Sequence, residues 1–100
     1  SLFKKFLDYP KNDLSDNALY WMGECYYDKR LFSKAKGFFT NVVTEYPKGN
    51  KVADAMLKLG MCNEMLNRFK DAKRLFKAVM LGYPDSSAAR IAMERIHALQ

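Results

Sequence analysis

A chain of 100 residues suffices for one small domain, and its 49% apolar and 14% aromatic residues exclude a disordered polypeptide. No apolar run approaches the roughly 18 residues that cross a bilayer, so we expect no insertion into a membrane. The 17 basic and 11 acidic residues give a net charge of +6, a general positive field that does not by itself indicate a nucleic-acid partner.

The chain opens with a segment that looks like the end of an incomplete repeat. The dipeptide Tyr-Pro occurs three times, with its proline at Pro10, Pro47 and Pro84, at intervals of 37 residues. One period separates Leu2, Phe3, Phe6 and Tyr9 from Phe39, Thr40, Val43 and Tyr46. We therefore interpret residues 1–10 as the last half of a second helix, in a chain cut from a longer protein.

Residues 11–47 are predicted to form one repeat of two helices. From Leu14 to Tyr27 and from Ser33 to Tyr46 the apolar residues fall three or four apart, as on one face of a helix. Asp13 or Ser15 is expected to cap the first helix and Ser33 the second. Pro47 ends the second helix, because the residue before a proline is driven out of the helical region.

Residues 48–84 repeat the pattern, with helices from about Asn50 to Leu66 and from about Lys70 to Tyr83. The identical residues at the 37-residue interval are Ala18 and Ala55, Gly23 and Gly60, Cys25 and Cys62, Phe32 and Phe69, Ala35 and Ala72, Phe39 and Phe76, and Val42 and Val79. A period between 20 and 50 residues is typical of a solenoid, in which each unit buries a face against the next.

The small residues that recur in both repeats have a geometric explanation. Gly23 and Gly60, with Ala35 and Ala72, allow paired helices to approach closely, and Phe39 and Phe76 fill the space beside them. Cys25 and Cys62 lie one unit apart, and units about 10 Å apart are too distant for a disulfide, which needs Cα atoms within about 7 Å. Both cysteines are therefore predicted to be buried and unpaired.

Residues 85–100 are predicted to form a capping helix that begins at Asp85 or Ser86. Ala89, Ala92, Met93 and Ile96 would face inward, and Arg90, Glu94 and Arg95 would form a polar outer face. No second helix follows, and a terminal helix with a polar face is typical of a solenoid cap.

The spacing Leu19-x-x-Met22-Gly23-x-x-Tyr26, then Ala35-x-x-x-Phe39 and Pro47, resembles the tetratricopeptide repeat. The second unit has Asn63 where the family has an aromatic residue. The resemblance implies an all-α solenoid of helical hairpins: about two full repeats, half an N-terminal helix and a capping helix.

A narrower resemblance covers almost the whole chain. The runs NALYWMGECYY from Asn17, FFTNVVTEYPKGNKVADAMLKLG from Phe38 and YPDSSAARIAMERI from Tyr83 are similar to the C-terminal repeat domain of the Tol-Pal system coordinator family. That family implies a periplasmic cell-division coordinator that binds TolA and acts with a bifunctional peptidoglycan synthase. It also implies a signal peptide and a trimerising N-terminal coiled coil in the parent chain.

Two other interpretations stay open. The repeats could instead form a structural module that packs on the rest of the parent chain or on a second copy. They could also belong to a subunit of outer-membrane assembly machinery, because lipoproteins of that class use similar Tyr-Pro endings.

In repeats of this type the first helix of each unit lines a concave groove that binds a partner. The predicted contacts are Tyr20, Trp21, Glu24, Tyr27, Leu57, Lys58, Met61 and Met65, with Asn17, Asp54 and Glu64 as further candidates. Tyr20, Trp21, Tyr27, Leu57, Met61 and Met65 would form an exposed apolar stripe, which usually marks an interface. Only Lys58 and Arg95 are basic along the groove, which disfavours the capture of a C-terminal carboxylate.

The inventory of reactive residues does not suggest an enzyme. The single histidine is His97, and the two cysteines lack the spacing of a zinc site or a redox pair. No phosphate-binding glycine loop or catalytic motif is present. We expect a non-catalytic protein with no metal or cofactor and no nucleic-acid partner.

Overall fold

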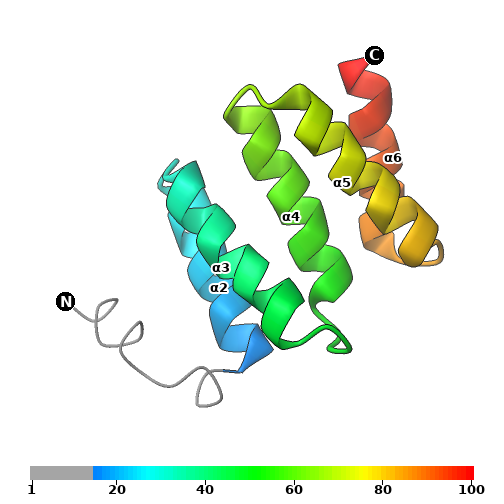
Figure 1. Ribbon diagram of the computed structural model, residues 1–100. Coiled ribbons are helices and arrows are strands. Elements are labelled where there is room, and N and C mark those ends of the chain that lie inside the picture. Colours follow the sequence, from blue (N-terminus) through cyan, green and yellow to red (C-terminus); the bar gives the residue numbers. More distant parts are fainter. Residues whose placement is uncertain (1–14) are drawn as a thin grey trace.

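The computed structural model describes residues 15–100, which form five α-helices (Figure 1). The helices are α2 (Asp16–Asp28), α3 (Phe32–Glu45), α4 (Val52–Met65), α5 (Phe69–Gly82) and α6 (Ser87–Leu99). Helices α2 and α3 form one antiparallel hairpin, α4 and α5 a second, and α6 packs against the second hairpin. The predicted all-α hairpin solenoid is confirmed. The predicted half-helix at residues 1–10 and the alternative cap Asp13 lie outside the described residues.

Side-chain caps begin two of the helices. The Ser15 hydroxyl accepts a hydrogen bond from the Ala18 N–H at 3.1 Å, and the Ser86 hydroxyl accepts one from the Ala89 N–H at 3.0 Å. These bonds satisfy backbone donors that have no partner within the helix. The caps predicted at Ser15 and Ser86 are confirmed.

The cap predicted at Ser33 is wrong. Helix α3 begins at Phe32, one residue before Ser33, and its N-cap is Leu31. The reason is the tight turn that joins α2 to α3. Arg30 adopts a positive φ of 63°, and the Leu31 N–H donates to the Tyr26 carbonyl at 2.9 Å. This backbone arrangement is a Schellman motif, which ends α2 and leads directly into α3.

The same turn recurs 37 residues later between α4 and α5. Asn67 has a φ of 62°, and the Arg68 N–H donates to the Asn63 carbonyl at 2.8 Å. The repeat in sequence is therefore also a repeat in backbone conformation.

Close helix contact occurs where the sequence places glycine. A Cβ atom added to Gly23 would lie 2.6 Å from Phe39 Cε1, and one added to Gly60 would lie 2.5 Å from Phe76 Cε1. Both phenylalanine side chains are fully buried. The predicted role of the two glycines is confirmed.

Two apolar clusters run through the solenoid. The first joins α2, α3 and α4, with Leu19, Tyr26, Phe39 and Val42 among its members, and Leu75 of α5 packs against it. The second joins α4, α5 and α6 around Phe76. Each hairpin thus completes its core with a helix of the neighbouring unit, as expected for a solenoid.

The two cysteines differ, although their positions are equivalent. Cys62 is fully buried between the two units, but Cys25 is exposed. Both are free thiols, as predicted, and the predicted burial of Cys25 is wrong. Cys62 belongs to the core that α4 shares with α2 and α3, whereas Cys25 belongs to neither of the two described core clusters.

The inner face of α6 is formed by Ala88, Ala89, Ala92 and Ile96. Met93 was predicted to face inward, but it is 46% exposed. The neighbouring Ala88, at 1% exposure, takes the inward position instead, because α6 contacts α5 much more extensively than α4.

Candidate protein-binding groove

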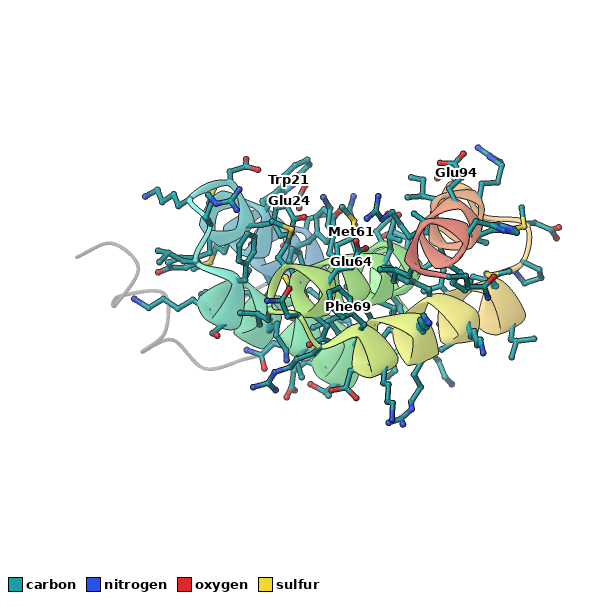
Figure 2. All side chains as sticks on the ribbon, turned by 90° about the horizontal axis from the view of Figure 1, so that it is seen from above. Trp21, Glu24, Met61, Glu64, Phe69 and Glu94 are labelled. Atoms are coloured by element: carbon teal, nitrogen blue, oxygen red, sulfur yellow. The ribbon has the colours of Figure 1, made fainter. Side chains whose placement is uncertain are left out.

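The first helices of the units, α2 and α4, lie with α6 on one side of the molecule, and α3 and α5 lie on the other (Figure 2). We call the α2–α4–α6 side the concave groove. It is formed by Trp21, Glu24, Tyr27, Lys58, Met61, Glu64, Met65 and Arg95. Figure 2 shows Trp21 and Glu24 on α2 followed by Met61 and Glu64 on α4.

Two ion pairs join the three helices across this groove. Lys58 Nζ lies 3.1 Å from Glu24 Oε1, with side chains 20% and 22% exposed, and connects α4 to α2. Arg95 donates from Nε to Glu64 Oε1 at 2.9 Å and also pairs through Nη2 with Glu64 Oε2, which connects α6 to α4. The hydrogen bond to Glu64 raises the pKa of the Arg95 guanidinium. Both groove cations are therefore engaged by carboxylates.

The contact between Glu24 and Lys58 is electrostatic rather than a well-aligned hydrogen bond. Glu24 Oε1 is buried and accepts no hydrogen bond of good geometry, although the ammonium group is within ion-pair distance. The Lys58 ammonium also lies 4.9 Å from the centre of the Tyr27 ring, a cation–π distance. Lys58 is thus held between an acidic and an aromatic side chain.

A small pocket of about 220 Å³ lies between α2, α4 and α6. It is lined by Tyr27, Met61, Glu64, Met65 and Arg95. Burial raises the pKa of the Tyr27 hydroxyl, so the tyrosine is neutral at physiological pH. The pocket therefore has apolar walls and one closed ion pair.

Trp21 lies at the end of the groove nearest the start of α2 and is 58% exposed. Its ring meets the Tyr20 ring edge to face, with centroids 5.6 Å apart. Lys51 Nζ lies 5.0 Å from the Tyr20 ring and 5.7 Å from the Trp21 ring. Lys51 was not among the predicted groove residues. It lies one helical turn before the candidate residue Asp54, and this spacing could have indicated that Lys51 belongs to the groove.

The family model of the tetratricopeptide repeat matches the sequence twice, at residues 17–49 and 54–86. These matches cover more than half of the chain and follow the two hairpins. The chain belongs to the tetratricopeptide repeat family. Domains of this family are in general non-catalytic modules that bind other proteins. No individual characterised protein matched the sequence.

Two predicted groove contacts do not lie on the exposed surface of this tetratricopeptide repeat chain. Tyr20 is 8% exposed and packs against Phe39 with ring centroids 5.5 Å apart, and Leu57 is 5% exposed. Leu57 belongs to the core that α4 shares with α5 and α6. The two residues occupy equivalent positions one period apart, and at both of them the neighbouring helices cover the side chain. The prediction that Tyr20 and Leu57 belong to an exposed stripe is therefore wrong.

The other predicted groove residues come together on one face. Trp21 and Met65 are exposed, at 58% and 40%, while Glu24, Tyr27, Lys58 and Met61 are half-buried. Arg95, predicted on the outer face of α6, turns toward α4 and pairs with Glu64. The exposed apolar stripe is thus shorter than predicted, with Trp21 at one end and the pocket at the other.

A larger cavity of about 370 Å³ lies away from the groove, at the edge of the first hairpin. It is lined by Tyr26, Lys34, Gly37, Phe38 and Asn41. One period later, at Asn63 and Leu75, the equivalent positions pack against the preceding unit: Lys36 donates to Asn63 Oδ1 at 2.8 Å, and Leu75 packs on the first core cluster. The larger cavity therefore occupies, in the first unit, the position at which the second unit packs against its neighbour.

A basic side of the molecule is formed by α3 and α5. Its residues are Lys34, Lys36, Lys70, Lys73, Arg74 and Lys77. Lys36 donates a hydrogen bond to Asn63, and Arg74 lies 3.8 Å from Asp71 in an exposed ion pair. The surface is charged, and Lys34 at its edge also lines the larger cavity.

Between residues 15 and 100 no three histidine, cysteine, aspartate or glutamate side chains are grouped so that they could hold a metal ion. Within the same part of the chain, no helix combines the length and apolar character needed to cross a membrane.

Proposed function

We propose that this tetratricopeptide repeat chain is a non-catalytic adaptor that binds a protein segment in its concave groove. The observation that carries the proposal is the alignment of Trp21, Tyr27, Met61 and Met65 along one face of the first helices. Aromatic and methionine side chains are enriched at the centres of protein interfaces, and large aromatics supply much of the binding energy. A partly exposed apolar stripe on a folded domain is typical of an interaction site.

We further propose TolA as the partner, in the bacterial periplasm. The support is the sequence resemblance to the Tol-Pal coordinator family, carried by the run from Asn17 to Glu24 and by the segment around Tyr46-Pro47. In this proposal the parent chain is a trimer, and the repeats link outer-membrane constriction to septal peptidoglycan synthesis. A bifunctional peptidoglycan synthase is the second proposed partner.

The test is a calorimetric titration of the chain with the periplasmic part of TolA, with Trp21 fluorescence recorded in parallel. Trp21 is the only tryptophan in the chain and lies in the groove, so its emission reports binding there. We expect saturable heat and a blue shift of the emission, because a bound segment removes water from the indole. The absence of saturable heat would contradict TolA as the partner.

One observation favours a second candidate, a structural module that packs on other copies of the chain. The cavity at Tyr26 and Phe38 lies on a face that, in the next unit, packs against another hairpin. Sedimentation of the wild-type chain and a Gly37→Lys variant, whose added side chain has open space around its Cβ, tests this candidate: self-association lost in the variant with unchanged melting would support it, and a wild-type monomer would exclude it.

A further inference from the structure

We infer that the groove selects a partner helix by one apolar side chain, which enters the pocket of Tyr27, Met61, Glu64, Met65 and Arg95, and that it does not select a carboxylate. This inference rests on the proposed adaptor function and adds the chemistry of the partner. Three features of the groove support it: the state of its cations, the size and lining of the pocket, and the backbone that surrounds it.

The cations of the groove are already engaged. Lys58 lies 3.1 Å from Glu24, and Arg95 makes a two-pronged contact with Glu64. Lys51 lies over the Tyr20 and Trp21 rings. A partner carboxylate at Lys58 or Arg95 would have to displace Glu24 or Glu64 and would leave that acidic group buried without its counter-charge. Such an exchange is costly, because a buried charge that loses its partner keeps the full desolvation penalty.

The pocket matches the size of a single side chain. Its volume of about 220 Å³ is below the roughly 300–1,000 Å³ of sites that hold small molecules. Tyr27, Met61 and Met65 supply apolar walls, and the unbranched methionines can adapt to side chains of different shape. The closed pair of Glu64 and Arg95 leaves the pocket without an unpaired charge. An aliphatic or aromatic side chain therefore complements the pocket best.

The surrounding backbone favours a helical partner. The groove is built from α2, α4 and α6, whose peptide groups are hydrogen-bonded within each helix. An extended segment would find no sheet edge with which to pair, whereas a helix satisfies its own backbone and presents side chains at i, i+4 and i+7. An amphipathic helix can reach both the pocket and Trp21 with residues of one face.

The experiment uses the chain with ¹³C-labelled methionine methyl groups, which report on Met61 and Met65 in the pocket. Met22, Met56, Met80 and Met93 lie elsewhere and serve as internal controls. Two helical peptides are titrated: one carries a leucine stripe with a central phenylalanine, and its matched version has glutamate in place of that phenylalanine. A third peptide is extended and ends in an acidic carboxyl-terminal segment.

We expect the phenylalanine peptide to shift Met61 and Met65, and the glutamate version to bind about tenfold more weakly or worse. The protein variant Met65→Glu should lose the same factor, and Met93→Glu, equally exposed but outside the pocket, should not. Preferential binding of the acidic peptide would overturn the inference, and so would shifts confined to the control methionines.

A titration with the periplasmic part of TolA shows whether the inference about the pocket or the proposed function has failed. If TolA binds and changes Trp21 emission while Met61 and Met65 stay unshifted, the adaptor function stands and the pocket assignment is wrong. If the phenylalanine peptide shifts Met61 and Met65 but TolA does not bind, the pocket stands and the proposed partner is wrong.

Discussion

At Gly23 and Gly60 the absence of a Cβ atom allows the paired helices to lie close together. Phe39 and Phe76 fill the space in which a Cβ atom would stand. Because these phenylalanines are fully buried, they cannot move aside without opening a gap elsewhere in the core.

We expect Gly60→Ala to lower the free energy of unfolding by about 1–3 kcal/mol, the usual cost of overpacking a tight core. Gly37→Ala is the matched control, because nothing lies within 4 Å of its added Cβ. Alanine is the better helix former, so the control should gain about 0.5–1 kcal/mol. Urea denaturation of both variants measures the difference. An equal effect at the two sites would contradict the close approach of α4 and α5.

The buried Cys62 thiol and Tyr20 hydroxyl make the stability of the fold depend on pH. Burial raises the pKa of the Cys62 thiol to about 12, partly offset by the nearby charges of Lys36 and Lys58, and it also raises the pKa of the Tyr20 hydroxyl. The folded chain then binds these protons more tightly than the unfolded chain, whose thiol has an ordinary pKa of 9.0.

The contribution of Cys62 to stability is therefore complete below about pH 9 and is lost as the pH rises toward 12. We expect the free energy of unfolding to fall over this range, and to fall less steeply in Cys62→Ala. Denaturation curves at a series of pH values measure the slope. Equal slopes for the two proteins would show that the thiol is not protected. The exposed Cys25, by contrast, should react with a thiol reagent in the native state while Cys62 does not.

Individual residues also show where sequence reasoning fails. Helical periodicity correctly placed Trp21, Tyr27, Met61 and Met65 on one face, but it also placed Tyr20 and Leu57 there. These two residues belong to the two apolar clusters, and the neighbouring helices cover them. How far a neighbour covers such a position depends on helix packing, which the period of the sequence does not contain.

At the scale of the elements, the order and approximate bounds of all five described helices could be predicted. Their apolar periodicity is strong, and Pro47 and Pro84 mark where α3 and α5 must stop. The start of α3 was missed because backbone hydrogen bonds at Arg30 and Leu31, rather than the Ser33 side chain, set it. Arg30 and Asn67 lie 37 residues apart, but the interval did not indicate that both have a positive φ.

The side-chain cap of α6 gives a test at this scale. Ser86 accepts from the Ala89 N–H and donates to the Tyr83 carbonyl at 2.7 Å, so it joins α6 to the end of α5. We expect Ser86→Ala to cost about 0.5–2 kcal/mol of unfolding free energy. Ser87→Ala, at the exposed next position, should be near neutral. Thermal melting of the two variants distinguishes them, and a loss shared by both would contradict a specific cap.

The register of α6 differs from that of α2 and α4 at one position. Its residue at the interval of Gly23 and Gly60 is His97, which is exposed. The Cβ of His97 would exclude a phenylalanine at the distance that Phe39 and Phe76 reach on α2 and α4. A helix packed on α6 would therefore need a wider spacing at this position than α3 has on α2 or α5 has on α4.

Across the whole molecule, the same repeat creates both the core and the groove. Side chains that face the paired helices close two apolar clusters, and those on the opposite side of α2 and α4 line the concave groove. The ion pairs from Glu24 to Lys58 and from Glu64 to Arg95 link the three groove helices. The sequence indicated these residue types along the groove, but not that the acidic and basic side chains pair with one another.

We propose that the partner binds in the concave groove and not on the basic side of α3 and α5. The most direct measurement compares calorimetric titrations of the wild-type chain, a Met61→Ser, Met65→Ser variant and a Leu81→Ser variant with the periplasmic part of TolA. Leu81, 84% exposed on α5, is the matched apolar control. We predict that the double variant, with unchanged melting, loses about tenfold or more in affinity, and that Leu81→Ser binds as the wild type does. Undiminished binding by the double variant, or a loss in Leu81→Ser alone, would contradict the claim.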